Sequence, residues 1–299
     1  MATAKISTRL AIHNILCALD LSPDSERILD YAQLIARRYD ARLYIAHVVP
    51  HSDPTSPPVE MLRPDQHPLT REAHQHLAQL ATRPGSPVAH SEILVGRGLV
   101  PGTVLLAMIP NHSIDFVVLG TTGRKGWDKF MLGSVAEQIF EQVNCPVLTV
   151  GPKALRKAAP PSIQQVLFPT DLSPESRAGL PYALSLAQEY QALLTLLFLV
   201  HPDVQSQEER LRFKGLYEPQ LRALIPAEVK QWCNVEYRVD FDVRAKGIVR
   251  IAGETGADVI VLGVRGSQTF AALMSHLPGP TAYEVVSEAP CPVLTVRAG

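Results

Sequence analysis

The sequence predicts an α/β fold with two tandem doubly wound domains, each a parallel sheet that carries helices on both faces. Two observations predict this fold. A long part of the chain occurs twice, and within each copy short apolar runs alternate with segments of helical periodicity. Continuous apolar runs are typical of parallel strands buried on both faces, because crossover helices cover such sheets.

The repeat is visible without gaps. Residues 21–49 and 172–200 share about a dozen identities, and CPVLTV occurs at both 145–150 and 291–296. The repeating unit of about 145 residues has the size of a whole domain, so it does not indicate a solenoid.

A segment rich in Pro, Ala and Lys, GPKALRKAAPPS, joins the two copies and is typical of an exposed linker. We therefore expect one domain over residues 1–155 and a second over residues 156–299.

Each copy divides into the same series of elements. In the first copy, strands are expected at 13–19, 42–49, 88–95, 115–119 and 146–150, and helices at 23–39, 67–82, 101–111 and 133–143. In the second copy, strands are expected near 163–169, 192–199, 234–241, 258–262 and 292–296. Ser22 followed by Pro23 predicts the start of the first helix, because serine is a good N-cap and proline fits the first helical position.

Composition excludes several classes of protein. The 28 Lys and Arg residues nearly balance the 29 Asp and Glu residues, which argues against a nucleic-acid binder. No apolar run reaches the length of a membrane span, and the first residues do not resemble a signal peptide. The four cysteines lack C-x-x-C spacing, so neither a disulfide scaffold nor a zinc site is expected and a reducing cytoplasm fits best.

The loop after the fourth strand, GTTGRKGWDKFMLGS, has the character of an anion site. Gly120, Gly123 and Gly133 would let a ligand approach the backbone without meeting a Cβ atom. The next helix begins near Ser134, and its first free amides and its dipole favour a phosphate group. Arg124 lies within the loop and adds positive charge.

These residues match the pattern G-x2-G-x9-G-[S/T], and in this respect the chain resembles the universal stress protein family. An aspartate after the first strand and the CPVLTV ending strengthen the resemblance, which covers both copies. The resemblance implies five parallel strands in the order 3-2-1-4-5. It also implies ATP as the ligand, with Mg²⁺.

The resemblance also assigns roles residue by residue. It places Asp20 near the ribose and the phosphate-bound metal, and it makes Val48 the residue whose backbone contacts adenine. The phosphates would be held mainly by backbone amides, at Gly120, Gly123, Gly133, Ser134 and Val135. A role for Arg124 follows from its charge and position and not from the family pattern.

Simpler interpretations exist for each of these residues. The glycines are also explained as turn residues, and Asp20 as support for the turn that follows it. Ser134 would serve as a helix cap with or without a ligand. Arg124 is equally well explained as a solvated surface charge.

The second copy departs from the pattern. Gly263 and Gly266 keep the first spacing, and Asp171 corresponds to Asp20. The expected Gly-Ser pair is replaced by Gly279-Pro280 after about three inserted residues, and proline lacks the amide that an anion would need. The second domain is therefore interpreted as degraded for triphosphate binding.

The first functional hypothesis is a cytoplasmic ATP-binding stress-response or regulatory protein that signals to a protein partner not identified by the sequence. The alternatives are a slow ATPase or adenylyl-transfer enzyme, and a nucleotide-free adaptor. No general base for a γ-phosphate is recognisable, so fast hydrolysis is not expected. Edge strands invite pairing, so we expect residues 147–150 and 293–296 to join the halves as a pseudo-dimer, which leaves homodimerisation open.

Overall fold

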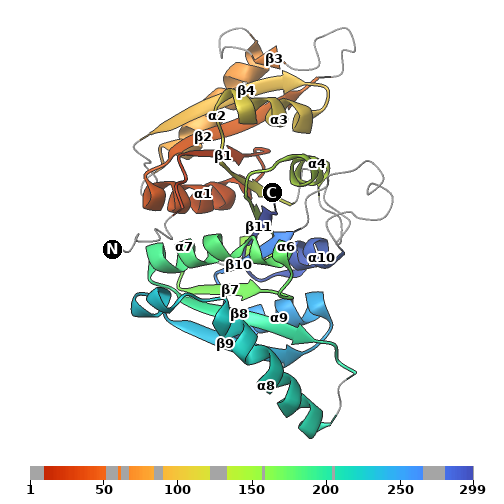
Figure 1. The fold of residues 1–299 in the computed structure, drawn as a ribbon. Helices are drawn as coiled ribbons and strands as arrows, with labels where there is room; N and C mark the ends of the chain where they lie inside the picture. Colours follow the sequence, from red (N-terminus) through yellow and green to blue (C-terminus); the bar gives the residue numbers. More distant parts are fainter. Residues whose placement is uncertain are drawn as a thin grey trace. The chain divides into compact units, whose positions relative to one another are not determined.

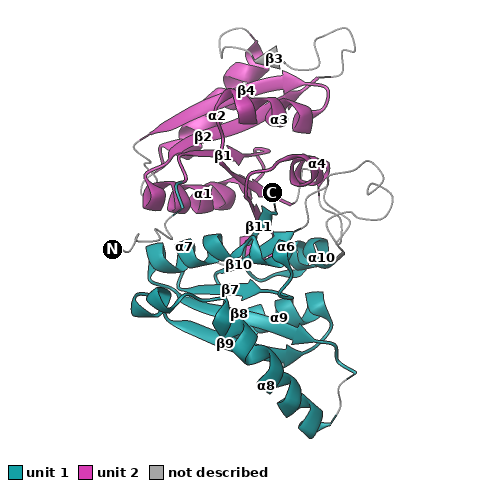
Figure 2. Ribbon diagram, in the orientation of Figure 1, with its two compact units in different colours: residues 1–11, 162–299 teal, residues 12–161 magenta. Residues whose placement is uncertain are grey.

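The computed structural model describes residues 10–51, 60–61, 67–83, 90–121, 133–156, 159–203, 206–264 and 280–298. The chain forms two compact units. The first domain comprises residues 12–161, and the second comprises residues 162–299 together with residues 1–11 (Figure 2). Within the second domain, the backbone amide of Leu10 donates a hydrogen bond to Ser185 Oγ over 3.2 Å. The expected boundary at 155/156 stays a prediction.

The first domain is built on five parallel strands (Figure 1). They are β1 (Asn14–Ala18), β2 (Arg42–Pro50), β4 (Ser91–Gly98), β5 (Phe116–Gly120) and β6 (Val147–Val150). Their spatial order is β4-β2-β1-β5-β6. The expected 3-2-1-4-5 order is therefore confirmed.

One strand was not expected. Glu60–Met61 forms β3, which pairs antiparallel with the outer side of β4, with Met61 opposite Gly96. The surrounding sequence is rich in proline and shows no alternating apolar pattern, so two paired residues leave no detectable signal.

Helices cover both faces of this sheet. They are α1 (Ser25–Tyr39), α2 (Pro68–Ala81), α3 (Pro101–Asn111) and α4 (Ser134–Gln142), and a short α5 (Pro152–Leu155) follows β6. Because the chain steps outward from β1 to β4 and then returns to β5 and β6, right-handed crossovers place α1 and α2 on one face and α3 and α4 on the other.

Side-chain contacts agree with this division of the helices. Arg83, just after α2, donates to Glu26 over 2.6 Å and to Asp30 over 2.8 Å, both of which lie on α1. On the other face, Gly102 of α3 lies directly against Gln138 of α4. A Cβ at Gly102 would overlap with that side chain.

The strands form the core of the domain. Every residue from Leu43 to Val49 of β2 is buried, and Ile15, Leu16 and Phe116 are at most 1% exposed. Burying a side chain of this size contributes about 1.5–3 kcal/mol. Burial on both faces explains why these strands appear as continuous apolar runs in the sequence.

The second domain repeats the architecture. Its strands are β7 (Gln165–Pro169), β8 (Leu193–Val200), β9 (Val235–Phe241), β10 (Val259–Val264) and β11 (Val293–Arg297), in the order β9-β8-β7-β10-β11. Its helices are α6 (Pro174–Arg177), α7 (Leu180–Tyr190), α8 (Gln207–Ala223), the 3-10 helix η1 (Ala227–Gln231), α9 (Arg244–Thr255) and α10 (Pro280–Glu288). Both domains thus have the doubly wound arrangement that the repeat predicted.

An aspartate recurs at the same place at the amino end of the strands in both domains. Asp115, which precedes β5, accepts hydrogen bonds from the backbone amides of His13 and Asn14. Asp258, which precedes β10, accepts from the amides of Gln164 and Gln165. In each domain, an aspartate at the equivalent position therefore holds the first strand beside the fourth.

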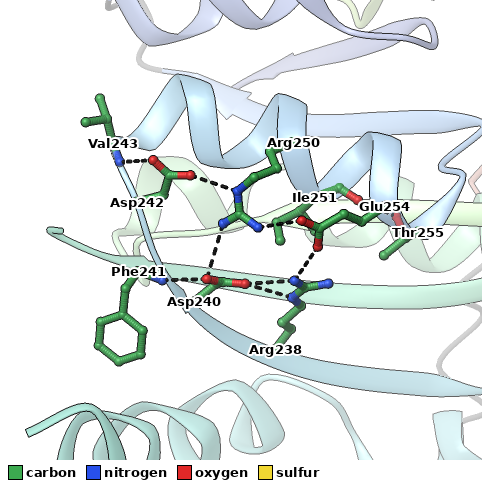
Figure 3. Close-up of polar contacts among 9 residues, drawn as sticks. All are labelled: Arg238, Asp240, Phe241, Asp242, Val243, Arg250, Ile251, Glu254 and Thr255. Atoms are coloured by element: carbon green, nitrogen blue, oxygen red, sulfur yellow. Dashed lines mark hydrogen bonds and ion pairs between the residues drawn. The ribbon is translucent and has the colours of Figure 1, made fainter. Parts of the chain in front are cut away.

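An ion-pair network ties α9 to β9 in the second domain (Figure 3). Arg238 bonds Asp240 over 2.8 Å and Glu254 over 2.6 Å. Arg250 contacts the same two acids and also Asp242, at distances between 2.6 and 3.2 Å. The two guanidinium groups thus bridge three carboxylates across the strand and the helix.

This network should make the second domain sensitive to acid. Burial raises the pKa of Asp240, but the Phe241 amide and the two arginines more than offset this, so its pKa lies below the ordinary value. A carboxyl group with a lowered pKa stabilises the fold above its unfolded pKa of about 4, and this stabilisation is lost as the pH falls through the folded pKa. Replacing Arg250 by glutamine should lower unfolding stability at pH 7 by about 1 kcal/mol, since the pairs are partly exposed, and should flatten the acid dependence.

Urea unfolding between pH 3 and pH 7 measures this effect. The matched control is Arg212→Gln, at an exposed arginine on α8 outside the network. Equal pH profiles for wild type and Arg250→Gln would show that the network has no electrostatic role.

Candidate functional site

The strand order gives the first domain a point beside β1 where the direction of the crossovers reverses. From β1 the chain passes to β2 on one side, and later it returns to β5 on the other. Ligands in such sheets bind beyond the carboxyl ends of the strands, where the direction of the crossovers reverses. The predicted Asp20, Val48, Gly120, Gly133, Ser134 and Val135 all come from segments at this end. Gly123 and Arg124 lie outside the described residues.

Asp20, two residues beyond β1, has one carboxylate oxygen engaged and one open. Oδ1 accepts hydrogen bonds from the Ser22 amide over 3.0 Å and from Ser25 Oγ over 3.2 Å. Oδ2 is buried and has no hydrogen-bond partner among the described residues. A buried carboxylate oxygen of this kind requires a donor or a cation. Asp20 therefore supports the turn and also offers an acceptor to a ligand.

The turn after Asp20 is strained in the same way in both domains. Leu21 has a φ of 60° and Leu172, after Asp171, has a φ of 67°. Leucine rarely adopts left-handed backbone, and such conformations gather at functional sites. Here the conformation turns the chain back so that the following serine amide reaches the aspartate.

The start of the first helix differs from the prediction. Helix α1 begins at Ser25 with Asp24 as its N-cap, and not at Pro23 with Ser22 as its cap. The Asp20 carboxylate binds both the Ser22 amide and the Ser25 hydroxyl, so the intervening residues form a turn. In the second domain the equivalent pair does start a helix, because Ser173 Oγ caps α6 at Ser176 N.

The backbone groups of Val48 are directed toward the end of β1. The carbonyl of Ala46 accepts from the Leu19 amide, so it points toward β1, and Ala46 is the last residue of β2 in register with β1. The peptide groups of successive residues in a strand point to opposite sides, so residues two apart point to the same side. The backbone groups of Val48 therefore point toward β1, as those of Ala46 do. Strand β2 runs on to Pro50 after β1 has ended. The peptide groups of Val48 are thus directed over the end of β1.

The first turn of α4 provides free amides, but the helix begins one residue differently from the prediction. The N-cap is Gly133, not Ser134, and no side chain caps the helix. The amide of Gly133 donates to the Thr121 carbonyl over 2.9 Å, so it is already used within the fold. The first intrahelical bond reaches the Glu137 amide. The amides that remain for an anion among the described residues are those of Ser134, Val135 and Ala136.

Gly120 has a role that the sequence did not reveal. A Cβ on this residue would lie 2.6 Å from Ile28 Cδ1, on α1. The glycine therefore lets α1 pack closely against the end of β5. Its expected role beside a ligand stays a prediction.

Several unpartnered polar atoms were missed by sequence reasoning. Thr121 is 4% exposed and its hydroxyl has no hydrogen-bond partner among the described residues. Ser22 Oγ, Arg27 Nε and both ring nitrogens of His51 are also buried atoms without a hydrogen-bond partner in this part of the chain. Thr121, Ser22 and His51 follow β5, β1 and β2. A polar residue soon after a strand is a signal that could have been used to find them. Their spacing along the sequence matches no motif.

At the equivalent end of the second domain, both oxygens of the corresponding aspartate contact the protein's own groups. Oδ1 of Asp171 accepts from the amide and hydroxyl of Ser173, and Oδ2 lies 3.5 Å from Arg244 Nη1. Burial raises the pKa of Asp171, but the hydrogen bonds of Ser173 and Ser176 and the charge of Arg244 bring it below its ordinary value. No orphan oxygen remains on Asp171.

A second difference between the domains concerns the glycine at the end of the fourth parallel strand. A Cβ on Gly263, the counterpart of Gly120, would overlap the carbonyl oxygens of Glu175 and Ser176. Helix α6 therefore lies directly on the end of β10. At the equivalent Gly120, the nearest described atoms to such a Cβ belong to the Ile28 side chain, and the nearest backbone atom, the Val150 carbonyl oxygen, is 4.0 Å away.

Three general features complete the description. Within the described residues, no group of three or more His, Cys, Asp or Glu side chains could hold a metal ion. No helix in that part of the chain is both long and apolar enough to span a membrane. All four cysteines are free, and three of them are buried.

Comparison with known proteins identifies the family. The sequence model described as the universal stress protein family matches residues 11–151 and again residues 162–297. The chain belongs to the universal stress protein family. It carries two copies of the family domain, as the repeat and the two sheets indicated.

Characterised relatives correspond to one of these domains in length. Universal stress protein A of Salmonella typhi and that of Escherichia coli are each 34% identical over 143 residues, which is 47% of this universal stress protein and 95% of the relative. Universal stress protein MJ0531 of Methanocaldococcus jannaschii is 31% identical over 140 residues, 46% of this chain and 80% of its own.

Solved structures match the whole chain. A universal stress protein from Archaeoglobus fulgidus gives a TM-score of 0.69 at 17% identity and covers 98% of both chains. The protein PA1789 from Pseudomonas aeruginosa, described as functionally unknown, gives 0.67 at 17% identity and covers 96% of this chain and 93% of its own. These similarities show that the two-domain fold is shared.

Proposed function

We propose that this universal stress protein is a cytoplasmic regulatory protein that binds one ATP, with Mg²⁺, at the carboxyl end of the first sheet. One observation carries the proposal. Buried polar atoms that have no hydrogen-bond partner among the described residues gather after β1, β2 and β5 of the first domain, and Oδ2 of Asp20 is among them. Buried groups of this kind are rare unless water or a ligand satisfies them.

The geometry supports a nucleotide that lies across the end of β1. The backbone of Val48 would contact the base, and Asp20 would contact the ribose or the metal. The first-turn amides of α4 would hold phosphate, since they combine free N–H groups with the positive end of the helix dipole. Gly123 and Arg124 belong to the proposed phosphate loop on sequence grounds alone.

The fit to Mg²⁺ depends on the nucleotide. The described residues offer one open carboxylate oxygen and no cluster of acidic or imidazole groups. Mg²⁺ is commonly held by one or two carboxylates together with substrate phosphates and water. Asp20 suits that arrangement, in which the metal would neutralise phosphate charge. A protein-only metal site does not fit.

A stoichiometry of one follows from the contrast between the domains. In the second domain Arg244 occupies the oxygen of Asp171 that corresponds to the open oxygen of Asp20, and α6 covers the equivalent glycine. We therefore expect one nucleotide per chain, and we propose that a protein partner responds to its presence.

Nucleotide analysis of the purified protein tests this function. Heat-denatured protein should release adenine nucleotide that mass spectrometry detects, and calorimetry with stripped protein should give one ATP site per chain. Incubation with ATP should leave it largely unhydrolysed. Finding neither released nucleotide nor saturable binding would exclude the proposal, and rapid ADP or AMP formation would favour an enzyme.

A further inference from the structure

His51 is a partly buried histidine whose ring nitrogens find no hydrogen-bond partner among the described residues. It directly follows β2, and its backbone amide donates to the Gly98 carbonyl over 3.3 Å, which fixes the residue at the carboxyl end of β2 and β4. Both ring nitrogens are buried, and neither has a hydrogen-bond partner among the described residues.

This situation differs from that of neighbouring histidines. His47 Nδ1 donates to the Leu19 carbonyl over 2.7 Å, and His67 Nδ1 accepts from the Leu69 amide over 3.2 Å. A neutral imidazole has one donor and one acceptor, and burying either without a partner is unfavourable. A ligand that hydrogen-bonds to the ring would remove that penalty.

The position of His51 indicates which part of a nucleotide it meets. It lies three positions after Val48, about 10 Å along the chain, which is comparable to the length of a nucleoside. The first turn of α4 follows β5, and β5 lies two strands away from β2, again about 10 Å. His51 is therefore on the base side of Asp20, away from the proposed phosphate site.

We propose that His51 binds the nucleoside end of the ligand, with a ring nitrogen hydrogen-bonded to the base or the ribose. The proposal rests on the proposed nucleotide function and adds a residue that the loop motif does not contain. A contact to the nucleoside strengthens binding of ATP, ADP and AMP by the same factor, because all three share it. A contact to phosphate would not.

Two variants test this role by calorimetry with ATP, ADP and AMP. His51→Leu should weaken the binding of each nucleotide by about tenfold, and by a similar factor for all three. His51→Gln should recover part of the affinity, since glutamine keeps a donor and an acceptor. The matched control is His90→Gln, at an exposed histidine at the amino end of the sheet, which should bind as wild type does.

Thermal unfolding without nucleotide separates binding from a structural role. Because His51→Leu removes unpartnered polar atoms, the Tm of the ligand-free protein should be unchanged or higher. Wild-type affinity in His51→Leu, a loss confined to ATP, or a marked fall in Tm would each overturn the proposal. If the wild-type protein binds no nucleotide at all, the proposed function fails as well. If the wild-type protein binds nucleotide and His51→Leu binds it equally well, the proposed function stands and only the role of His51 is lost.

Discussion

Replacing Gly133 by aspartate should reduce the affinity for ATP at least about 100-fold while leaving the fold intact. The carboxylate would stand at the N-terminus of α4, where the phosphates are proposed to bind. Two charges about 4 Å apart interact by roughly 4 kcal/mol near a protein surface, which more than accounts for the expected loss. The amides of Ser134 and Val135 would then face a charge of the protein's own.

The same substitution should not destabilise the protein. Gly133 has φ −59° and ψ 145°, a conformation open to any residue, and it is the N-cap of α4. Aspartate is a favourable N-cap and complements the helix dipole.

Gly133→Asn is the matched control, because it has nearly the same shape and no charge. Calorimetry and thermal unfolding of both variants decide the matter. Equal ATP affinity in wild type and Gly133→Asp would refute the phosphate site.

Replacing Asp20 by asparagine should weaken Mg²⁺-dependent ATP binding by about 10- to 100-fold. The amide oxygen of asparagine can still accept from the Ser22 amide and Ser25 Oγ, so the turn should persist. What is lost is the negative charge at the open oxygen. The effect should therefore shrink when Mg²⁺ is removed by a chelator.

The internal repeat provides the control for this experiment. Asp171→Asn makes the same chemical change in the second domain, where Arg244 already contacts the carboxylate. It should leave ATP affinity and stoichiometry unchanged. Equal losses in the two variants would show that the second domain also binds nucleotide, and no loss in Asp20→Asn would remove Asp20 from the site.

Much of the fold could be predicted because it is written in local patterns. Strand β5 is a continuous apolar run and α2 has helical periodicity, and both lie within about three residues of their expected bounds. The duplication fixed the number of domains. The two-residue strand β3 escaped prediction because its pairing depends on a neighbour distant in sequence.

The site was only partly predictable. Asp20, Val48 and the start of α4 were predicted through the resemblance, and all three lie at the carboxyl end of the first sheet. The packing of Gly120 and the hydrogen bond of Gly133 could not be predicted, because each depends on a residue from elsewhere in the chain, Ile28 in one case and Thr121 in the other.

The sequence by itself determined the doubly wound fold, its duplication and the loop motif, because periodicity, repeats and spacing are properties of neighbouring residues. Only the tertiary structure showed that, among the described residues, Oδ2 of Asp20 has no partner whereas Oδ2 of Asp171 lies beside Arg244. It also showed that the buried ring nitrogens of His51 have no hydrogen-bond partner among the described residues. Whether a polar atom is satisfied depends on groups brought together from distant parts of the chain, and no local pattern records that.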